Sequence, residues 1–485
     1  MAAFTDVRRF IDLVDDLGEL RTVKGAHWDL EIGGITELAQ HQINGPAVLF
    51  DDIPDYPSGH RVFINSMGSA NRTALALDLP TGLSMRELLP LWRERSKRIE
   101  PIPMNYVTDG PVMENVFEGD KIDMYAFPTP KWHELDGGRY IGTGSFDVTL
   151  DPDSDWINLG CYRVMVLGRD KLGFYISPGK HGRIMRDSYF ARGKPMPVVM
   201  SFGHDPTLFL GASIEVPPNV CEYDYVGGIK GGPVNVIKGP VTGLPFPADA
   251  EIVVEGFAYP GDTGEEGPFG EWTGYYASDH RNEPILTVKA VYHRNNPVIL
   301  GSPPGKPPTE LTSYRGLMRS ALVWEQVEKA GVPDVTGVWC HEAGGARLLV
   351  AISIKQRYPG HARQAGHVAA MCHAGAYLGR YVVVVDEDIE VTDLNDVVWA
   401  MCTRAEPEES FDLIKRAWSG PLDPRIPKAR KGLNSRFVID ATRPWEWKDE
   451  FPAVAEMSPG MRKQIVDKWG DLILGTGKPR IPAGV

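Results

Sequence analysis

The chain has 485 residues, of which 42% are hydrophobic, 9% aromatic and 24% charged. This length predicts two or three domains with sizeable cores, and the ordinary composition excludes a largely disordered chain. A net charge of −13, without a long block of basic residues, argues against a nucleic-acid partner.

The same features predict a soluble, cytoplasmic protein. The five cysteines are scattered and form no CxxC pair, which is typical of reduced thiols. The first twenty residues mix acidic and apolar side chains and lack the pattern of a signal peptide. No stretch approaches the roughly 18 to 20 apolar residues that cross a bilayer, so no membrane partner is expected.

The N-terminal region has the pattern of an α/β fold. Apolar residues recur at helical spacing from Phe4 to Leu17, and Gly18 is suited to end that helix. Short apolar runs over 47–53 and 61–67 predict strands.

A second helix is expected near residue 90. Ser84 and Glu87 fit a capping box at its start. Pro90 leaves two alternatives, because a proline within the pattern either kinks the helix or requires that it begin later.

From about residue 110 to 305 the chain consists of short strand-like runs separated by glycine and proline. This pattern predicts a mainly β domain, either a sandwich or a barrel. The predicted strands lie in "GTGSFDVTL", "NLGCYRVMVLG", "PVVMSFG", "AEIVVEGFAY", "PILTVKAVYH" and "PVILGS".

The last third alternates helices and strands. A strong helix is predicted over 309–331 and ends at Gly331, and a second is expected around 360–378. Between and after them lie the strand-like "GARLLVAISI" and "RYVVVVDEDI" and the helical "DLNDVVWAMCTR". We therefore expect a separate C-terminal α/β domain.

The stretch "EEGPFGEWTGYY", residues 265–276, concentrates acids in a glycine-rich segment where neither helix nor strand is favoured. One interpretation is a solvated hairpin loop. The other is a general acid/base pair formed by Glu266 and Glu271, because aromatic neighbours would hold the two carboxylates in partly apolar surroundings. Glu265 is expected to stay in solvent.

A second group of candidates lies upstream. Arg163, within an apolar strand pattern, is either salt-bridged in the core or directed at an anion. Asn158, His181 and Glu222 are each more often structural than functional. Together they offer the hard oxygen and nitrogen ligands that suit Mg²⁺ or Mn²⁺ better than zinc. In an unbroken strand Asn158 and Arg163 would point to opposite faces, unless a bulge or Gly160 changes this.

Two enzyme classes are disfavoured by the motifs that the sequence lacks. It contains no G-x-x-x-x-G-K-[ST] loop, which argues against a nucleotide hydrolase, and no G-x-S-x-G elbow, which argues against a serine hydrolase.

The order of these motifs resembles the UbiD family of prenylated-flavin decarboxylases over nearly the whole chain. The resemblance implies an α/β (α+β) fold in which a central, β-rich, split-barrel-like flavin-binding domain is flanked by an N-terminal α/β region and a C-terminal α/β oligomerisation domain. The expected segments are 1–110, 111–305, a linker helix over 306–330, and 331–485. The matching motifs are "INLGCYR" at 157–163, "KHG" at 180–182, "CEYDYVGG" at 221–228, "EGPFGE" at 266–271, "VVVVDEDIEVTDLNDVVWAMCTR" at 382–404 and "FVIDAT" at 437–442.

The resemblance also implies roles for individual residues. The family's catalytic arginine and two glutamates fall on Arg163, Glu266 and Glu271. A divalent ion, Mn²⁺ or Mg²⁺, would be held with the cofactor phosphate by Asn158, His181 and Glu222. A potassium ion near that phosphate would involve Trp156, Ser213 and Glu222. Further cofactor contacts are expected from Thr143, Gly160, Cys161, Tyr162, Arg163, Lys180 and Arg380.

Two positions depart from the family pattern. Arg380 stands where the family often has lysine, which keeps the charge toward the flavin but changes its geometry. Lys180 precedes His181 where several relatives have a neutral side chain, and this could affect the cofactor or an acidic group of the substrate.

The implied activity is a reversible, non-oxidative decarboxylation through a covalent adduct between prenylated FMN and an aromatic, heteroaromatic or α,β-unsaturated carboxylic acid. The implied partners are a flavin prenyltransferase that supplies the cofactor and further copies of the chain, in a dimer or hexamer. Two alternatives stay open: an FMN-dependent oxidoreductase, and a non-catalytic subunit of a multi-protein aryl carboxylase.

Overall fold

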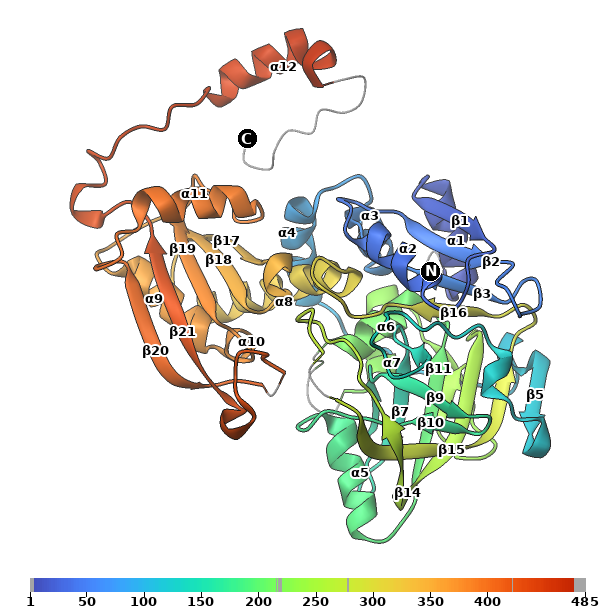
Figure 1. Ribbon diagram of the computed structural model, residues 1–485. Coiled ribbons are helices and arrows are strands. Elements are labelled where there is room, and N and C mark those ends of the chain that lie inside the picture. Colours follow the sequence, from blue (N-terminus) through green and yellow to red (C-terminus); the bar gives the residue numbers. More distant parts are fainter. Residues whose placement is uncertain (1–3, 215, 217–219, 277–278, 421, 475–485) are drawn as a thin grey trace. The chain divides into compact units, whose positions relative to one another are not determined.

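The computed structural model describes residues 4–214, 216, 220–276, 279–420 and 422–474 (Figure 1). The chain forms two compact units. The first unit contains Met1–Ser84 and Glu94–Arg315, and the second contains Met85–Arg93 and Gly316–Val485.

The first unit begins with a four-stranded sheet in the order β1-β2-β3-β16. The predicted first helix is confirmed, because Asp6 caps it by accepting a hydrogen bond from the backbone of Arg9, and Gly18 follows it with a φ of 72°. The elements are α1 (Val7–Asp16), β1 (Leu20–Lys24), α2 (Glu31–Gln40), β2 (Ala47–Asp51), β3 (Arg61–Ile64), α3 (Ala70–Ala76) and β16 (Val298–Gly301).

Strand β16 corrects one prediction. The sequence placed "PVILGS" in the central β domain, but β16 pairs in parallel with β3 of the N-terminal sheet. All four residues of β16 are buried. A strand that is apolar on both faces carries no periodic signal that identifies its partner.

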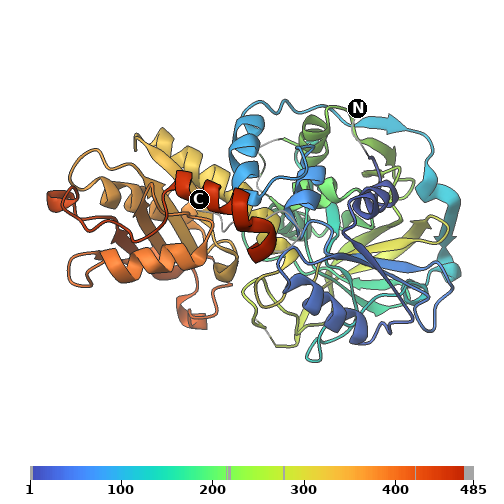
Figure 2. The same ribbon diagram turned by 90° about the horizontal axis from the view of Figure 1, so that it is seen from above.

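The central sheet of the first unit has the order β6-β9-β10-β15-β14-β11-β7-β8, and β5 adds to β15. Several of these strands are labelled in Figure 1, and Figure 2 shows the chain from above. The predicted β-rich domain is thus confirmed. Its strands are β5 (Asn115–Glu118), β6 (Tyr140–Gly142), β7 (Phe146–Leu150), β8 (Ile157–Gly160), β9 (Val164–Gly168), β10 (Lys171–Gly173), β11 (Met196–Phe202), β14 (Ile252–Glu266) and β15 (Arg281–His293).

Smaller elements complete the first unit. A three-stranded sheet pairs β13 (Pro245–Pro247), β12 (Asn235–Lys238) and β4 (Asn105–Val107). The helices within the β-rich region are α5 (His181–Ala191), α6 (Pro206–Ser213) and α7 (Glu222–Lys230). Short 3-10 turns lie at Pro111–Glu114, Gly119–Lys121 and Met124–Ala126.

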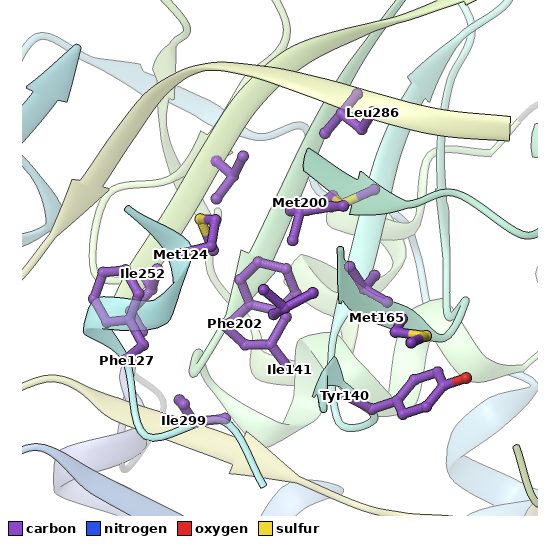
Figure 3. Close-up of a cluster of buried hydrophobic side chains, with 14 of the residues drawn as sticks. Met124, Phe127, Tyr140, Ile141, Met165, Met200, Phe202, Ile252, Leu286 and Ile299 are labelled. Atoms are coloured by element: carbon purple, nitrogen blue, oxygen red, sulfur yellow. The ribbon is translucent and has the colours of Figure 1, made fainter. Parts of the chain in front are cut away.

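Two apolar clusters form the core around the central sheet. One contains Met200, Leu286 and Tyr140, and Figure 3 shows Tyr140 beside Met165, its partner in the ladder between β6 and β9. The other cluster contains Phe146 and Val148. Side chains alternate along β7, so Asp147, which lies between Phe146 and Val148, points to the other side of the sheet, where the first cluster lies.

The second unit is a five-stranded sheet in the order β17-β18-β19-β21-β20, with α9 packed against it. The predicted alternation of helices and strands is confirmed, although the helix expected around 360–378 is interrupted at Cys372. The elements are α4 (Met85–Ser96), α8 (Glu310–Lys329), β17 (Val335–Cys340), β18 (Leu349–Ile354), α9 (His361–Met371), α10 (His373–Ala376), β19 (Tyr381–Asp386), α11 (Leu394–Arg404), β20 (Phe411–Trp418), β21 (Leu433–Ala441) and α12 (Pro459–Leu474), with 3-10 turns at Glu342–Gly344, Lys428–Arg430 and Trp445–Trp447. The first residues of α8 and the last residues of α4 belong to the first unit.

The helices bear on two further expectations, one about Pro90 and one about membrane-spanning segments. Helix α4 contains Pro90 and starts before it, so the alternative of a start after Pro90 is wrong. In the part of the chain that the structure describes, no helix has the length and apolar character needed to cross a membrane.

Candidate active site

The segment that carries the two glutamates begins as a strand. Glu266 is the last residue of β14 and lies opposite Arg281 in β15, so the prediction that no strand forms here is wrong for this residue. Gly267 then adopts a φ of 85°, which starts the turn toward Glu271. The outermost acid, Glu265, has a 73% exposed side chain, as expected.

The turn is held by a close backbone contact. The backbone N–H of Gly137 donates a hydrogen bond of 2.8 Å to the carbonyl of Pro268. A Cβ atom on Gly137 would lie 1.8 Å from the carbonyl oxygen of Gly267, so a glycine is required here. Phe269 is buried against Tyr140, with ring centroids 3.8 Å apart, which anchors the turn to the core.

Arg163 and the two glutamates form one cluster. Arg163 donates two hydrogen bonds to Glu266, from Nε at 2.8 Å and from Nη2 at 2.7 Å. Its Nη1 lies 3.5 Å from Oε1 of Glu271. The side chains of Arg163, Glu266 and Glu271 are 9%, 1% and 16% exposed, so the cluster is largely desolvated and its charges interact strongly.

Two tyrosines that the sequence analysis missed complete the cluster. The hydroxyl of Tyr140 donates a 3.0 Å hydrogen bond to Oε1 of Glu266, and the guanidinium of Arg163 lies 4.6 Å from the ring centroid of Tyr175. Burial and the neighbouring Glu266 raise the pKa of Tyr140, so its hydroxyl stays protonated as a donor. Burial is the largest single effect on Arg163 and lowers its pKa, but the charge and hydrogen bonds of Glu266 together with the charge of Glu271 outweigh it, so the pKa of the guanidinium is raised.

Asn158 and Arg163 are separated by the end of a strand. Strand β8 ends at Gly160 and β9 begins at Val164, so the two residues do not belong to one unbroken strand. The expectation that an unbroken strand would direct Asn158 and Arg163 to opposite faces therefore does not apply.

The three predicted metal ligands are gathered around β8. Nδ1 of His181, at the start of α5, lies 3.2 Å from Oδ1 of Asn158. Glu222, the first residue of α7, accepts a 2.8 Å hydrogen bond from the backbone of Leu159. Burial raises the pKa of Glu222 to about 7, because a carboxylate removed from water is less stable in its charged form.

Among the described residues, no group of three or more His, Cys, Asp or Glu side chains is placed to hold a metal ion. The set of Asn158, His181 and Glu222 contains only two side chains of these types, because its third member is an asparagine. The ring of Trp156 packs edge-on against His181 at 4.8 Å. Tyr162 accepts a hydrogen bond of 3.2 Å from the backbone of Gly182, which ties the ligand set to the start of α5.

The remaining predicted contacts are distributed more widely. Ser213 shares a 2.9 Å hydrogen bond with Tyr314, and the hydroxyl of Thr143 accepts one of 3.0 Å from the backbone of Ser302. Lys180 directly precedes α5. Arg380 lies in the second unit, where it pairs with Asp423. All five cysteines, including Cys161, are free thiols.

Taken together, the fold and the site define a class of protein, namely a mixed α/β enzyme with a buried arginine–carboxylate cluster and a group of potential oxygen and nitrogen ligands around β8. Family models agree with this class. They match 3-octaprenyl-4-hydroxybenzoate carboxy-lyase domains: the N-terminal domain over residues 11–92, the Rift-related domain over 105–307 and the C-terminal domain over 312–441.

Individual relatives match nearly the whole chain. Pyrrole-2-carboxylic acid decarboxylase of Pseudomonas aeruginosa is 33% identical and covers 97% of this chain and 98% of its own. Vanillic acid decarboxylase of Sedimentibacter hydroxybenzoicus, in open form, superimposes with a TM-score of 0.84 at 30% identity, covering 96% of this chain and 98% of its own. The UbiD-class enzyme HmfF from Pelotomaculum thermopropionicum, in complex with FMN, superimposes with a TM-score of 0.84 at 28% identity, covering 94% of this chain and 98% of its own. The chain belongs to the UbiD family and is a carboxy-lyase.

Proposed function

We propose that the protein catalyses the reversible, non-oxidative decarboxylation of an aromatic, heteroaromatic or α,β-unsaturated carboxylic acid with prenylated FMN. The observation that carries this proposal is the cluster in which one carboxylate, Glu266, holds Arg163 by two hydrogen bonds while a second, Glu271, lies 3.5 Å away. Structures of the relative HmfF contain FMN and, in an evolved dimeric form, prFMN.

The residues around β8 fit a flavin phosphate bridged by metal ions. Asn158, His181 and Glu222 supply the oxygen and nitrogen atoms that Mn²⁺ or Mg²⁺ accepts beside a phosphate. The buried Nε1 of Trp156 has no hydrogen-bond partner among the described residues, and the carboxyl of Glu222 has a raised pKa, so both favour an added polar or cationic partner. Trp156, Ser213 and Glu222 would hold K⁺.

Prenylated FMN, when bound, supplies an electrophile that bonds to the substrate carbon and takes up the electron pair left when CO₂ departs. The protein must then orient the carboxylate and deliver a proton. Arg163 is suited to bind the substrate carboxylate, because a guanidinium recognises carboxylates through paired hydrogen bonds. Glu266 and Tyr140 fix its orientation.

Glu271 is the proposed proton donor. Its side chain is more exposed than that of Glu266, and its contact to Arg163 is longer, at 3.5 Å compared with 2.7 Å. Arg163 therefore holds it less tightly than Glu266, which suits a group that exchanges a proton with the reacting carbon. The same group would remove the proton in the carboxylation direction.

The test compares Glu271→Gln with Glu265→Gln in protein loaded with cofactor. Glu271→Gln should lower CO₂ release and solvent-deuterium incorporation by a factor of about 10² to 10⁴ while the flavin absorbance is kept. Glu265→Gln, on the exposed neighbour, should stay near the wild-type rate. Full activity of Glu271→Gln would contradict the assignment, and flavin reduction without CO₂ release in the wild type would favour an oxidoreductase.

We infer further that the protein acts in the cytoplasm as a homo-oligomer, a dimer or hexamer, and receives its cofactor from a flavin prenyltransferase. One face of the sheet in the second unit supports the oligomer. It exposes aligned apolar side chains, because Tyr381, Phe437 and Leu413 are direct neighbours across β19, β21 and β20. A second copy would remove this apolar surface from water.

A further inference from the structure

Asp147 is a buried carboxyl group on the face of the central sheet that carries the ligand set. In the ladder between β7 and β8, Asp147 lies opposite Gly160 and Thr149 lies opposite Asn158. Paired residues share a face and alternate residues of a strand do too, so Asp147, Thr149 and Asn158 point to the same side. The flanking Phe146 and Val148 point into the apolar cluster on the other side.

The carboxyl group of Asp147 has no partner within the described part of the chain. The residue is 0% exposed, and neither of its oxygens makes a hydrogen bond to any described group. Burial alone raises its pKa well above the ordinary value. A polar group buried in this way destabilises a fold, which calls for an explanation in terms of a ligand.

Glu255 in the same sheet shows how this protein normally buries a carboxylate. It is also 0% exposed, but it accepts hydrogen bonds from the backbone of Thr242 at 2.8 Å and from the hydroxyl of Tyr292 at 2.8 Å. Asp147 and Glu255 therefore differ in their partners and not in their burial.

The position of Asp147 indicates which part of a ligand it would meet. Two residues of a strand span about 7 Å, so the pair of Asp147 and Gly160 lies about that far from the pair of Thr149 and Asn158, in the direction in which the chain continues from Asn158 to Arg163. A flavin mononucleotide with its phosphate at the ligand set and its ring toward Arg163 must pass its ribityl chain over this interval. That chain offers hydroxyl groups, which both donate and accept hydrogen bonds.

We propose that Asp147 is a flavin-binding residue whose carboxyl group hydrogen-bonds a hydroxyl of the ribityl chain. The inference rests on the proposed use of a flavin and adds a contact that the ligand set and the arginine cluster do not supply. It gives a role to a carboxyl group that has no hydrogen-bond partner among the described residues on this face of the sheet.

The test measures two properties of the full-length apoprotein with Mn²⁺ present: its melting temperature and its dissociation constant for FMN. In Asp147→Val, the melting temperature without FMN should rise by about 2 to 4 °C, because the unpartnered carboxyl group is gone. The dissociation constant for FMN should increase about tenfold, with the absorption bands of bound FMN unchanged. Asp147→Asn, which keeps the hydrogen-bonding capacity, should stay within about threefold of the wild type.

Glu255→Gln is the matched control. It should lower the melting temperature, because a partnered carboxylate is lost, and leave the FMN affinity of the folded protein unchanged. Asp147→Ala serves the same purpose as Asp147→Val if the latter does not fold, with the same loss of FMN affinity expected.

Three outcomes would overturn the proposal. Unchanged FMN affinity in Asp147→Val would make Asp147 a tolerated buried acid, and a lower melting temperature without FMN would make it a structural residue. A shift in the flavin absorption bands would place the contact at the ring and not at the ribityl chain. A fourth outcome concerns the wild type. If the wild type fails to bind FMN, the proposed function is overturned too, whereas the first three outcomes contradict only the role of Asp147.

Discussion

Arg163 illustrates how single residues set the chemistry of this site. Its guanidinium is held in its plane by two hydrogen bonds to Glu266 and lies over the ring of Tyr175. A lysine could satisfy neither contact in the same way, because an ammonium group is a point donor without a plane. Nε and Nη2 of Arg163 are thus held by Glu266, while Nη1 points to Glu271.

The sequence pointed to the charged residues of the cluster but not to the tyrosines that contact them. Arg163, Glu266 and Glu271 were candidates because each lies within a motif that resembles the family, and the structure brings the three together. Tyr140 could not be identified in this way, because it is 126 positions from Glu266 and no periodicity connects β6 to the end of β14. Only the pairing of strands brings such residues together.

His204 provides a pH-dependent prediction for one residue. It is buried, with Nδ1 placed 3.1 Å from the hydroxyl of Ser201, and burial lowers its pKa to about 3. The unfolded chain has the ordinary histidine pKa of about 6.5 and therefore binds a proton that the folded protein excludes. The contribution of neutral His204 to the free energy of unfolding is fully present above about pH 6.5 and is lost as the pH falls toward about 3.

The measurement compares the wild type with His204→Gln by thermal unfolding at pH 7 and pH 4.5. The wild type should lose about 1.4 kcal/mol per pH unit more than the variant below pH 6.5, so the difference in stability between them should narrow. His280→Gln, whose side chain is 56% exposed, is the control and should follow the wild type. Parallel pH profiles for the wild type and His204→Gln would contradict the prediction.

At the scale of elements, the turn after β14 depends on a close approach of two backbones. A Cβ on Gly137 would lie 1.8 Å from the carbonyl oxygen of Gly267, whereas a Cβ on the adjacent Gly138 would meet only the terminal methyl of Met165 at 2.3 Å. Backbone cannot move aside without displacing the turn, but a methionine side chain can rotate.

We therefore expect Gly137→Ala to displace the turn that joins Glu266 to Glu271. It should cost roughly 2 kcal/mol of stability and lower CO₂ release at least tenfold, because small displacements of catalytic groups are costly. Gly138→Ala should cost less than about 1 kcal/mol and keep most of the activity. Equal effects of the two substitutions, measured by thermal unfolding and CO₂ release, would show that the contact at Gly137 is not needed.

The elements themselves were largely predictable, because amphipathic helices and alternating strands carry periodic signals. Two errors have a common physical cause. The glycine content of residues 261–270 concealed that β14 continues to Glu266, and the uniform burial of β16 concealed that it pairs with β3. In both places the ladder hydrogen bonds to distant strands decided the structure, and such pairings are absent from local sequence.

At the scale of the whole molecule, one face of the sheet in the second unit exposes apolar side chains near its β20 edge. Leu413 and Trp418 of β20 are 47% and 55% exposed, and β20 is an edge strand. Exposed apolar side chains on an edge strand favour association, and natural monomers usually protect such edges with charged residues. The proposed homo-oligomer would use this face.

The decisive variant is Leu413→Lys combined with Trp418→Lys. In light scattering after gel filtration the wild type should have at least twice the chain mass of 53.6 kDa, and the double variant should dissociate toward a single chain, because each buried charge without a partner opposes association. The control is Leu38→Lys on α2, which is 69% exposed in the first unit and should leave the mass unchanged. A wild type that stays at 53.6 kDa at micromolar concentration, or a double variant that keeps the wild-type mass, would contradict the assignment of this face.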